Sequence, residues 1–589
     1  MFTPGTVLLH DNLALDGRNL LFTEPREILV AHDAASARAA LARLQAAGRE
    51  GLWAAGYLSY ELGLLFEERL HKLLPARSDA PLLWLGLYDA ARPLGRDAVD
   101  AMLAGAGAGR AENFALRLDP AAYRQAFDRV KALIEAGDCY QVNLTLKARF
   151  RLDGDPLGLY RVLAQSQKVA YGAYINAGDH HVLSRSPELF VAGTGDLLDV
   201  RPMKGTLKRG RSLAEDAAGR LALAADAKNR AENLMIVDLL RNDLGRIART
   251  GTVEVTDLYT VETYPSLHAM TSGIRARKRP GLDIVDVLEN LFPCGSITGA
   301  PKVRAMEIIH AVETGPRGLY TGAIGYVAPN GDFAFNVAIR TAVIDGQGNG
   351  EIGIGGGIVA DSDAEAEYQE ALLKLKFLAD PAPPVTLIET LKWSPGEGFV
   401  LLDRHLDRLL DSAAYFALPV TRAAAAAYLS QSARSWTAPM RVRLTLSEAG
   451  LDLTAVPLPP TPARFRFAIA PEALDSTSVW LAHKTTNRAF YDLPRQRAHD
   501  ERGLDELLFR NERNELTEGS FTNLFVERDG RLLTPALASG ILPGTLRGEL
   551  LATGRAAEQV LTLADLASAD AIFLGNSVRG LVPADWVKD

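Results

Sequence analysis

A cluster of prolines divides this sequence of 589 residues into two unequal parts. The segment LADPAPPV, residues 378–385, carries three prolines within four positions. Proline cannot continue a helix or sit in a central strand, so the helical pattern AEAEYQEALLKLKFLA must end there. A new apolar segment, VTLIETLKW, follows at once. We therefore predict two domains, residues 1–378 and 386–589, joined by a proline-rich linker at 379–385.

Composition and charge exclude several classes of protein. Apolar residues make up 48% of the chain and charged residues 23%, which is the mixture of a globular protein. A formal charge of −8, with no block of Lys or Arg, predicts neither a nucleic acid nor a membrane surface as a partner. No apolar run of about 18 residues and no signal peptide is evident, so we expect a cytoplasmic enzyme. Two cysteines, Cys139 and Cys294, cannot form a disulfide framework or a thiolate zinc site.

Strand and helix patterns in the first part do not alternate regularly. Residues 180–193, 322–344 and 351–360 are predicted to form strands, with a hairpin turn at Pro329-Asn330-Gly331. Residues 229–244 and 301–313 have the spacing of helices. This order favours a large α+β domain over a doubly wound sheet.

Three glutamates lie on predicted helices in positions that suit a metal. Glu232 precedes apolar residues at three, four, seven and eight positions further on, so it points along a buried face. Glu367 and Glu370 stand one turn apart on a second helix, residues 361–378. Helical carboxylates that face a common interior suit Mg²⁺. The alternative for Glu370 is an ordinary helix ion pair with Lys374, which periodicity alone favours.

Two other features of the first part are ambiguous by themselves. Lys204 is predicted to lie in a short loop after a strand, where a lysine is usually solvated. The segment EIGIGGGIVAD, residues 351–361, lacks the spacing of a dinucleotide-binding loop and is better explained as a strand end whose backbone N–H groups meet an anion. No GxxxxGK[ST] loop is present, so ATP hydrolysis is not expected.

Eight motifs of the first part follow one another in a recognisable order. They are QVNLT (141–145), SRSPELF (184–190), RPMKGT (201–206), AENLMIVDLLRNDLG (231–245), LFPCGSITGAPKVRAMEII (291–309), YTGAIGY (320–326), NVAIRT (336–341) and GGGIVADSDAEAEYQE (355–370). Over about residues 115–378 the first part therefore resembles the chorismate-binding family, which includes anthranilate synthase, isochorismate and salicylate synthases and aminodeoxychorismate synthase component I. The segment GYLSYELG (56–63) is also similar.

The resemblance assigns roles to residues of the first part. Glu232 and Glu370, with Glu367 beside them, would hold a Mg²⁺ that binds the ring carboxylate of chorismate. Glu188 would be the general acid for the leaving 4-hydroxyl, and His268 matches a family histidine near the ring hydroxyl, although a structural role is equally expected. The substrate contacts implied are Tyr320, Arg340, Gly355, Gly356, Gly357 and Lys374.

Two positions distinguish reactions within the family. Isochorismate and salicylate synthases carry a lysine base where this chain has Gln141, so activation of water at carbon 2 is not expected. Anthranilate synthases typically have Ala where this chain has Lys204, whereas a lysine there resembles aminodeoxychorismate synthase. Its implied role is to attack carbon 2 as the 4-hydroxyl leaves, before ammonia adds at carbon 4.

The second part carries three separated elements that together suit pyridoxal phosphate. Lys484 ends a strand-like run, SVWLAHK, Glu518 follows a hairpin-like segment, and Gly544 and Thr545 stand at a helix start that suits a phosphate. Each element alone is more often structural, as a surface lysine, a capping glutamate or an ordinary turn. A second proline cluster at 456–465 indicates a hinge between two subdomains.

These motifs together resemble the fold-type IV pyridoxal phosphate family over about residues 386–585. That family includes branched-chain and D-amino-acid aminotransferases and aminodeoxychorismate lyase. Lys484 would form the Schiff base and Glu518 would face the ring nitrogen. The phosphate contacts implied are Arg408, Thr545, Leu546 and Ser577. The family usually has about twenty residues, a strand hairpin, before the LIET-like strand, and the linker replaces them here. This departure affects the contacts of a homodimer formed through the pyridoxal phosphate domain.

The two resemblances imply an α+β protein: a large chorismate-binding-enzyme β-sandwich with outer helices, then a two-subdomain fold-type IV domain. They predict a bifunctional enzyme of folate-precursor synthesis that aminates chorismate at carbon 4 and then eliminates pyruvate to give 4-aminobenzoate. Neither cysteine lies in an amidotransferase nucleophile elbow, so ammonia would come from a separate glutamine amidotransferase subunit or from solution. The alternatives are an anthranilate-type synthase fused to an aminotransferase, and a pairing in which one half only scaffolds or regulates.

Overall fold

The computed structural model describes residues 2–14, 16–265 and 267–588, and it divides the chain into two compact units. The first unit comprises residues 1–208 and 220–382, and the second comprises residues 209–219 and 383–589. The chain passes from the first unit to the second within the predicted linker. The sequence did not predict that residues 209–219 belong to the second unit. The domain limits 1–378 and 386–589 themselves stay a prediction.

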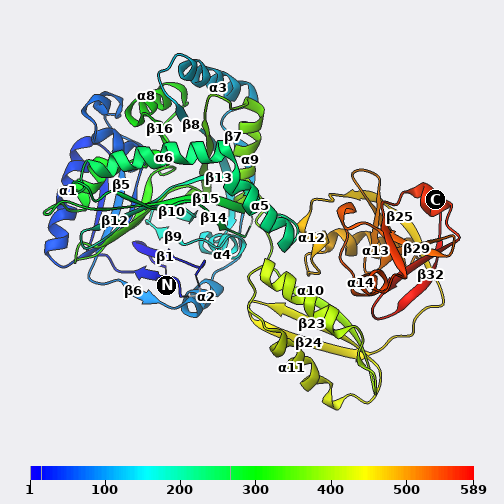
Figure 1. The fold of residues 1–589 in the computed structure, drawn as a ribbon. Coiled ribbons are helices and arrows are strands. Elements are labelled where there is room, and N and C mark those ends of the chain that lie inside the picture. The colour runs from blue at the N-terminus through cyan, green and yellow to red at the C-terminus, as the bar shows by residue number, and fades with distance from the viewer. Residues whose placement is uncertain (1, 15, 266, 589) are drawn as a thin grey trace. The chain divides into compact units, whose positions relative to one another are not determined.

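Two large antiparallel sheets form the first unit (Figure 1). The first has the order β16 (Gly299–Ala300), β8 (Gln141–Gly154), β20 (Asn349–Ile358), β19 (Thr341–Asp345), β10 (His180–Ser186), β9 (Tyr171–Asn176), β1 (Thr6–His10), β2 (Asn19–Phe22) and β6 (Arg92–Leu94), with β7 (Gly109–Leu116) also paired to β8. The second has the order β13 (Met203–Lys208), β15 (Leu267–Arg277), β12 (Leu197–Arg201), β11 (Leu189–Thr194), β18 (Phe333–Val337), β17 (Ala323–Val327), β4 (Trp53–Leu58), β5 (Leu83–Tyr88) and β3 (Glu27–Ala31), with β14 (Glu254–Thr263) also paired to β15.

The two sheets pack face to face, which confirms the predicted sandwich. One apolar cluster joins Val7 and Ile175 of the first sheet to Trp84 and Ile324 of the second. Helices cover the outer faces, because each sheet has a second apolar face that must be buried. They are α1 (Ala34–Arg49), α2 (Arg96–Ala104), α3 (Pro120–Glu135), α4 (Pro156–Ser166), α6 (Ala227–Gly245), α7 (Ile284–Leu291), α8 (Lys302–Val312) and α9 (Ala364–Ala379).

Local sequence explains the elements that carry the first site. Asp226 caps α6 by accepting a hydrogen bond from Asn229 N, and Asp363 caps α9 in the same way. Helix α6 packs against β13 and β15, and α9 packs against β20. The predicted hairpin is present, since β17 and β18 flank Asn330-Gly331, where Gly331 takes a φ of 85°.

The second unit contains two separate sheets on either side of the proline cluster at 456–465. The smaller has the order β22 (Gly398–Phe399), β21 (Leu387–Ser394), β23 (Met440–Ser447) and β24 (Gly450–Pro457), with α10 (Leu402–Tyr415) and α11 (Arg422–Ser432). The larger has the order β27 (Leu516–Gly519), β26 (Glu506–Asn511), β25 (Phe465–Leu474), β32 (Gly580–Trp586), β31 (Ala571–Asn576), β28 (Asn523–Arg528), β29 (Arg531–Pro535) and β30 (Ala556–Gln559), with α12 (Val479–Ala482), α13 (Ala489–Arg502), α14 (Thr545–Ala552) and α15 (Leu563–Ala567).

Two local predictions were wrong. Lys204 lies within β13 rather than in a loop, and the run SVWLAHK forms α12, one short helical turn, rather than a strand. An apolar run of four residues fits one turn of helix as well as a strand, so its pattern cannot distinguish them. No helix in the described ranges is long and apolar enough to cross a membrane.

Candidate active sites

Two glycines of β20, Gly356 and Gly357, border the first candidate site. A Cβ built on Gly357 of β20 would lie 2.8 Å from Gln141 Nε2 and 3.1 Å from Lys204 Nζ. The side chains from β8 and β13 therefore meet over a strand that has no side chain of its own at this position. Both polar atoms of the Gln141 amide are buried and make no hydrogen bond with another described residue. Unsatisfied buried amide groups are costly, so this space suits a polar ligand.

Lys204 is held in an environment that favours its neutral form. Burial lowers the pKa of Lys204, while the carboxylates of Glu232 and Glu188 act in the opposite direction. An amine whose pKa is lowered by burial is available as a nucleophile or a base. The lysine is therefore part of the site and is not the solvated loop lysine that its sequence context favoured.

Glu188 lies between β10 and β11 and is 3% exposed. Ser296 Oγ donates a hydrogen bond to Glu188 Oε1 at 2.6 Å. Burial raises the pKa of Glu188 to about 7, although Ser296 and Lys204 both oppose this rise. A carboxyl group with a pKa near neutrality can donate a proton at the pH of the cell.

The three glutamates predicted to bind metal interact with one another. Helix α6 buries Asn233, Ile236 and Leu240, so Glu232 stands half-buried at the margin of its apolar face. Burial raises the pKa of Glu232, and the charge of Glu367 adds to this effect. The pKa of Glu367 is also raised by burial, with a further contribution from Glu370.

A cation would relieve this repulsion, so the donor set fits Mg²⁺ in its chemistry. Among the described residues, however, no three His, Cys, Asp or Glu side chains stand close enough to form a metal cluster. Glu370 instead binds Lys374 Nζ at 2.8 Å, which is the helix pair that periodicity favours. The same Lys374 Nζ donates to the carbonyl of Gly355 at 2.8 Å. A Cβ built on Gly356 would lie 3.0 Å from Glu367 Oε2, so the glutamates lie close to the glycines of β20.

Arg340 is a half-buried cation between β18 and β19. It follows β18 with a φ of 49° and forms no ion pair with another described residue. Burial lowers the pKa of Arg340 to about 10, with the Tyr264 side chain opposing. The Tyr264 hydroxyl lies 3.5 Å from the carbonyl of Pro187, the neighbour of Glu188. Since a buried cation is costly without a partner, Arg340 suits the carboxylate of a ligand.

Two other predicted residues lie close by. Tyr320 is buried beneath β20, where a Cβ on Gly353 would overlap its ring. His268 is buried on β15, the neighbour of β13, and its Nδ1 lies 3.0 Å from Thr263 Oγ1. Their contact with substrate stays a prediction.

Lys484 lies in a cavity of about 990 Å³ within the second unit. It follows α12, and its carbonyl accepts a hydrogen bond from Ile388 N of β21 at 2.8 Å. Burial lowers the pKa of Lys484 to about 7, and the charges of Arg488 and Arg408 lower it further. A lysine with this pKa is neutral in about half of the molecules near pH 7, and a carbonyl-binding lysine reacts in its neutral form.

Glu518 faces the same cavity from β27. Its carboxylate accepts hydrogen bonds from Tyr491 Oη at 3.0 Å, Asn523 Nδ2 at 2.9 Å and Leu542 N at 2.9 Å. Burial raises the pKa of Glu518 to about 7, and the hydrogen bonds from Leu542 N and Tyr491 Oη oppose this rise. The acid is thus held in a fixed orientation, with a pKa at which it can share a proton with a ring nitrogen.

The predicted phosphate contacts gather around His405. Its Nε2 lies 2.9 Å from Ser577 Oγ and 3.3 Å from Thr545 Oγ1. Thr545 begins α14 after Gly544, with no side-chain cap, so the first N–H groups of the helix are open to an anion. Leu546 follows in the same turn. Arg408 lines the cavity and also binds Glu389, with its Nη2 2.7 Å from Glu389 Oε2. A lysine, a carboxyl group and this cradle together fit pyridoxal phosphate.

Sequence reasoning missed the residues that hold the predicted ones in place. They are Ser296, Glu389, His405, Tyr491 and Asn523. The spacing of His405 and Arg408, three positions apart on one helix face, was a signal for one of them. Glu389 is held ionised, since Arg408 and His405 outweigh burial and keep its pKa at about 2.

Comparison with known proteins matches two families to separate parts of the chain. Residues 17–380 match the chorismate binding enzyme family, and residues 386–586 match the family described as amino-transferase class IV. Aminodeoxychorismate synthase component 1 of Klebsiella aerogenes is 39% identical over 345 residues, which cover 55% of this chain and 75% of that protein. Anthranilate synthase component 1 of Neisseria meningitidis is 41% identical over 265 residues, 45% of this chain and 53% of that protein.

A solved structure agrees with the fold of the first unit. Anthranilate synthase component I from Streptococcus pneumoniae superposes with a TM-score of 0.51 at 25% identity, covering 64% of this chain and 91% of that one. The sequence matches and this structural similarity thus agree on the family of the first part of the chain. The chain belongs to the chorismate binding enzyme family, and its family domain is fused to a class IV aminotransferase domain.

Proposed function

We propose that the chain makes 4-aminobenzoate from chorismate in two steps. The first unit would replace the 4-hydroxyl of chorismate with an amino group, and the second would eliminate pyruvate from the product. The observation that carries the first step is the position of Lys204, whose Nζ faces Gln141 over Gly357 and whose pKa is lowered by burial. The ammonia would come from a glutamine amidotransferase partner.

The residues of the first site can carry out the amination in sequence. Glu188, in its protonated form, donates its proton to the leaving 4-hydroxyl, which departs as water. The neutral Lys204 Nζ forms a bond to carbon 2 as both ring double bonds shift toward carbon 4. Ammonia then adds at carbon 4, both double bonds return, and Lys204 leaves as the neutral amine. The extra proton on the new amino group passes to Glu188 and restores the acid.

Other residues would bind and orient the substrate. Arg340 offers a bidentate contact to a carboxylate, and Tyr320 and the Gly355–Gly357 backbone border the ring. Glu232 and Glu370, with Glu367 close by, would hold Mg²⁺, which would supply positive charge for the ring carboxylate. Lys374 would have to release Glu370 when the metal binds.

The second site has the groups needed for a lyase. Pyridoxal phosphate, held by Arg408, Thr545, Leu546 and Ser577, would act as an electron sink that acidifies carbon 4 of the substrate. Lys484 would take the carbon 4 proton, because its lowered pKa leaves about half of the molecules with a neutral amine near pH 7. Loss of the enolpyruvyl group then produces the aromatic ring, and the enol becomes pyruvate.

Arginines in the second cavity favour a substrate with two carboxylates. Arg441 and Arg443 alternate along β23, so both project from one face, and both line the cavity. Neither forms an ion pair with another described residue. The ring and enolpyruvyl carboxylates of 4-amino-4-deoxychorismate supply two anions for them.

The alternative is an anthranilate-type synthase fused to an aminotransferase, since anthranilate synthases are as similar in sequence as aminodeoxychorismate synthases. One experiment distinguishes the two. Purified protein is incubated with chorismate, Mg²⁺, ammonium and pyridoxal phosphate, and the products are separated by chromatography. We expect 4-aminobenzoate and pyruvate; anthranilate or salicylate as the aromatic product would contradict the proposal.

A further inference from the structure

Residues Arg209–Gly219, here called the strap, are part of the second unit although first-unit segments flank them in sequence. The strap begins directly after β13, the strand that carries Lys204. It contains the first residues of α5 (Leu213–Ala225). The chain therefore enters the second unit at Arg209, leaves it after Gly219 and enters it again at Pro383.

A buried ion pair and an aromatic ring hold the start of the strap. Arg209 Nε donates to Asp216 Oδ2 at 2.8 Å, and each side chain is 8% exposed. Arg209 Nη1 donates to the carbonyl of Tyr415 at 2.9 Å, and its guanidinium carbon lies 3.7 Å from the centre of the Tyr415 ring. The Tyr415 hydroxyl donates back to the carbonyl of Gly210 at 2.7 Å. Loss of one partner would leave a buried charge uncompensated, so Arg209 fixes the strap on Tyr415.

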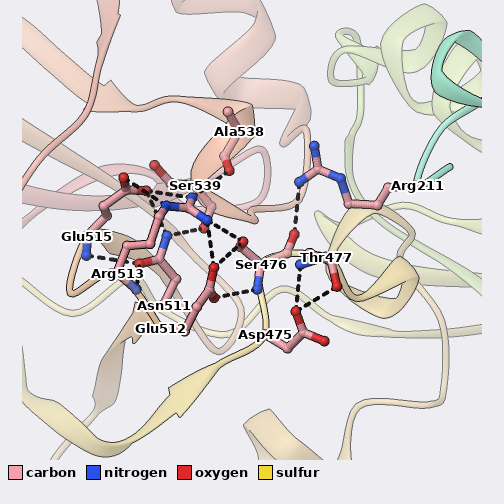
Figure 2. Close-up of polar contacts among 10 residues, drawn as sticks. All are labelled: Arg211, Asp475, Ser476, Thr477, Asn511, Glu512, Arg513, Glu515, Ala538 and Ser539. Carbon is pink, nitrogen blue, oxygen red and sulfur yellow. Dashed lines mark hydrogen bonds and ion pairs between the residues drawn. The ribbon is translucent and has the colours of Figure 1, made fainter. Parts of the chain in front are cut away.

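Arg211 fixes the strap at a second point, as Figure 2 shows. Its Nη1 donates to the carbonyl of Ser476 at 2.9 Å. Ser476 is itself held by Glu512, which accepts from Ser476 N at 2.9 Å and from Ser476 Oγ at 2.7 Å. Arg513 Nη1 donates to the same hydroxyl at 2.8 Å. The strap is thus tied to a segment whose own polar groups are fixed.

Tyr415 leads from the strap to the lysine of the second site. Its ring centre lies 4.5 Å from that of His483, the residue before Lys484. Ser412 Oγ lies 2.8 Å from His483 Nδ1, and the Phe416 ring centre lies 5.0 Å from that of the imidazole. Burial lowers the pKa of His483 to about 4, whereas the nearby backbone of Arg211 favours the charged imidazole. The buried Nε2 of His483 makes no regular hydrogen bond with any described residue.

We propose that the strap is a positioning element of the second site: by holding Tyr415 against His483, it fixes the backbone that presents Lys484. Arg209 is not among the residues that line the cavity, so it acts only through Tyr415 and His483. The role of Lys484 rests on the proposed function, whereas the docking of the strap does not. The prediction is that the second activity depends on a segment that precedes its own domain in the sequence.

Digestion of the cofactor-free full chain with trypsin tests whether the strap is docked. Lys208, Arg209 and Arg211 are cleavage sites that a docked strap protects. Asp216→Asn keeps all three sites but removes the partner of Arg209, so we expect faster cutting between residues 208 and 212 than in wild type. Arg464→Gln is the matched control, because its ion pair with Asp585 is exposed. Wild-type protein cut there as fast as Asp216→Asn would overturn the inference.

Spectroscopy with pyridoxal phosphate tests the positioning. In Arg209→Gln we expect the absorbance band of the lysine-bound cofactor to titrate at a different pH from wild type. We expect kcat for supplied 4-amino-4-deoxychorismate to fall by up to about 10²-fold, the cost of a small misplacement, while KM changes little. Arg209→Lys, which keeps the charge, should recover part of both. Tyr415→Phe, a milder change that removes only the hydroxyl on Gly210, should shift the band in the same direction.

The outcomes separate the inference from the function on which it rests. A wild-type protein that forms no cofactor band would overturn the proposed role of Lys484. A wild-type band that titrates identically in Arg209→Gln and Tyr415→Phe would overturn the positioning role of the strap and leave the lyase proposal intact.

Discussion

Replacing Ser296 with alanine should make Glu188 a weaker acid and extend amination to higher pH. Ser296 Oγ donates to Glu188 Oε1 at 2.6 Å, and this bond stabilises the ionised carboxylate. Burial already raises the pKa of Glu188 to about 7, so about half of the molecules carry the proton at neutral pH. An ordinary glutamate would carry it in about one molecule in 500. Without the serine hydroxyl, the opposing contribution is lost and the pKa rises further.

The size of the change follows from the strength of that bond. A hydrogen bond to a charged group contributes about 1.5–3 kcal/mol to stability, and about 1.4 kcal/mol corresponds to one pH unit. The serine hydroxyl can also accept a hydrogen bond from the protonated acid, so the lower end applies. We expect the pKa of Glu188 to rise by about one pH unit.

The assay is the pH profile of kcat/KM for chorismate consumption with ammonium. Because the protonated acid is the active form, the rate falls as pH rises through the pKa of Glu188, and in Ser296→Ala this fall should occur about one pH unit higher. Thr298→Val is the control, since it removes a buried hydroxyl from the same loop that bonds only to backbone carbonyls. An alkaline fall at the same pH in wild type and Ser296→Ala would refute Glu188 as the proton donor.

Four further substitutions test the proposed functions. Glu370→Gln or Glu232→Gln should abolish chorismate consumption while supplied 4-amino-4-deoxychorismate is still cleaved; loss of both activities would contradict separate sites. Lys204→Ala should lose amination at carbon 4, with slow formation of anthranilate as a measurable alternative, and near-normal 4-aminobenzoate output would exclude the lysine as a nucleophile. Lys484→Ala should lose the band of the lysine-bound cofactor and about 10²–10⁴-fold of the lyase rate, so that 4-amino-4-deoxychorismate accumulates; a retained band would show that another lysine binds the cofactor.

Local patterns predicted the main helices and strands around the first candidate site but not which residues come together there. Asp caps and apolar spacing define α6 and α9, and both helices lie where they were expected. Periodicity alone favoured an ordinary helix pair for Glu370 and a solvated loop for Lys204. Only the resemblance to a family assigned them to a site, because residues of β13, β20 and α9 come together only through the tertiary fold.

The contacts that support the sites could not be predicted from local sequence. Ser296 meets Glu188 from a segment 108 positions away, and Arg209 meets Tyr415 across 206 positions. Such pairs consist of common residue types with no spacing rule between them. Lys484 stays a predicted site residue, but the predicted strand before it was wrong because a short apolar run does not distinguish a helical turn from a strand.

The chain enters the second unit twice, and this limits how the protein can be divided into fragments or assembled from them. A gene fragment that begins at the proline cluster would encode the lyase-like half without residues 209–219, and Tyr415 would lose the arginine that covers its ring. A fragment that ends there would instead carry that segment without its binding surface. Separately expressed halves should therefore be compared with and without this segment supplied in trans before either is taken as an independent enzyme.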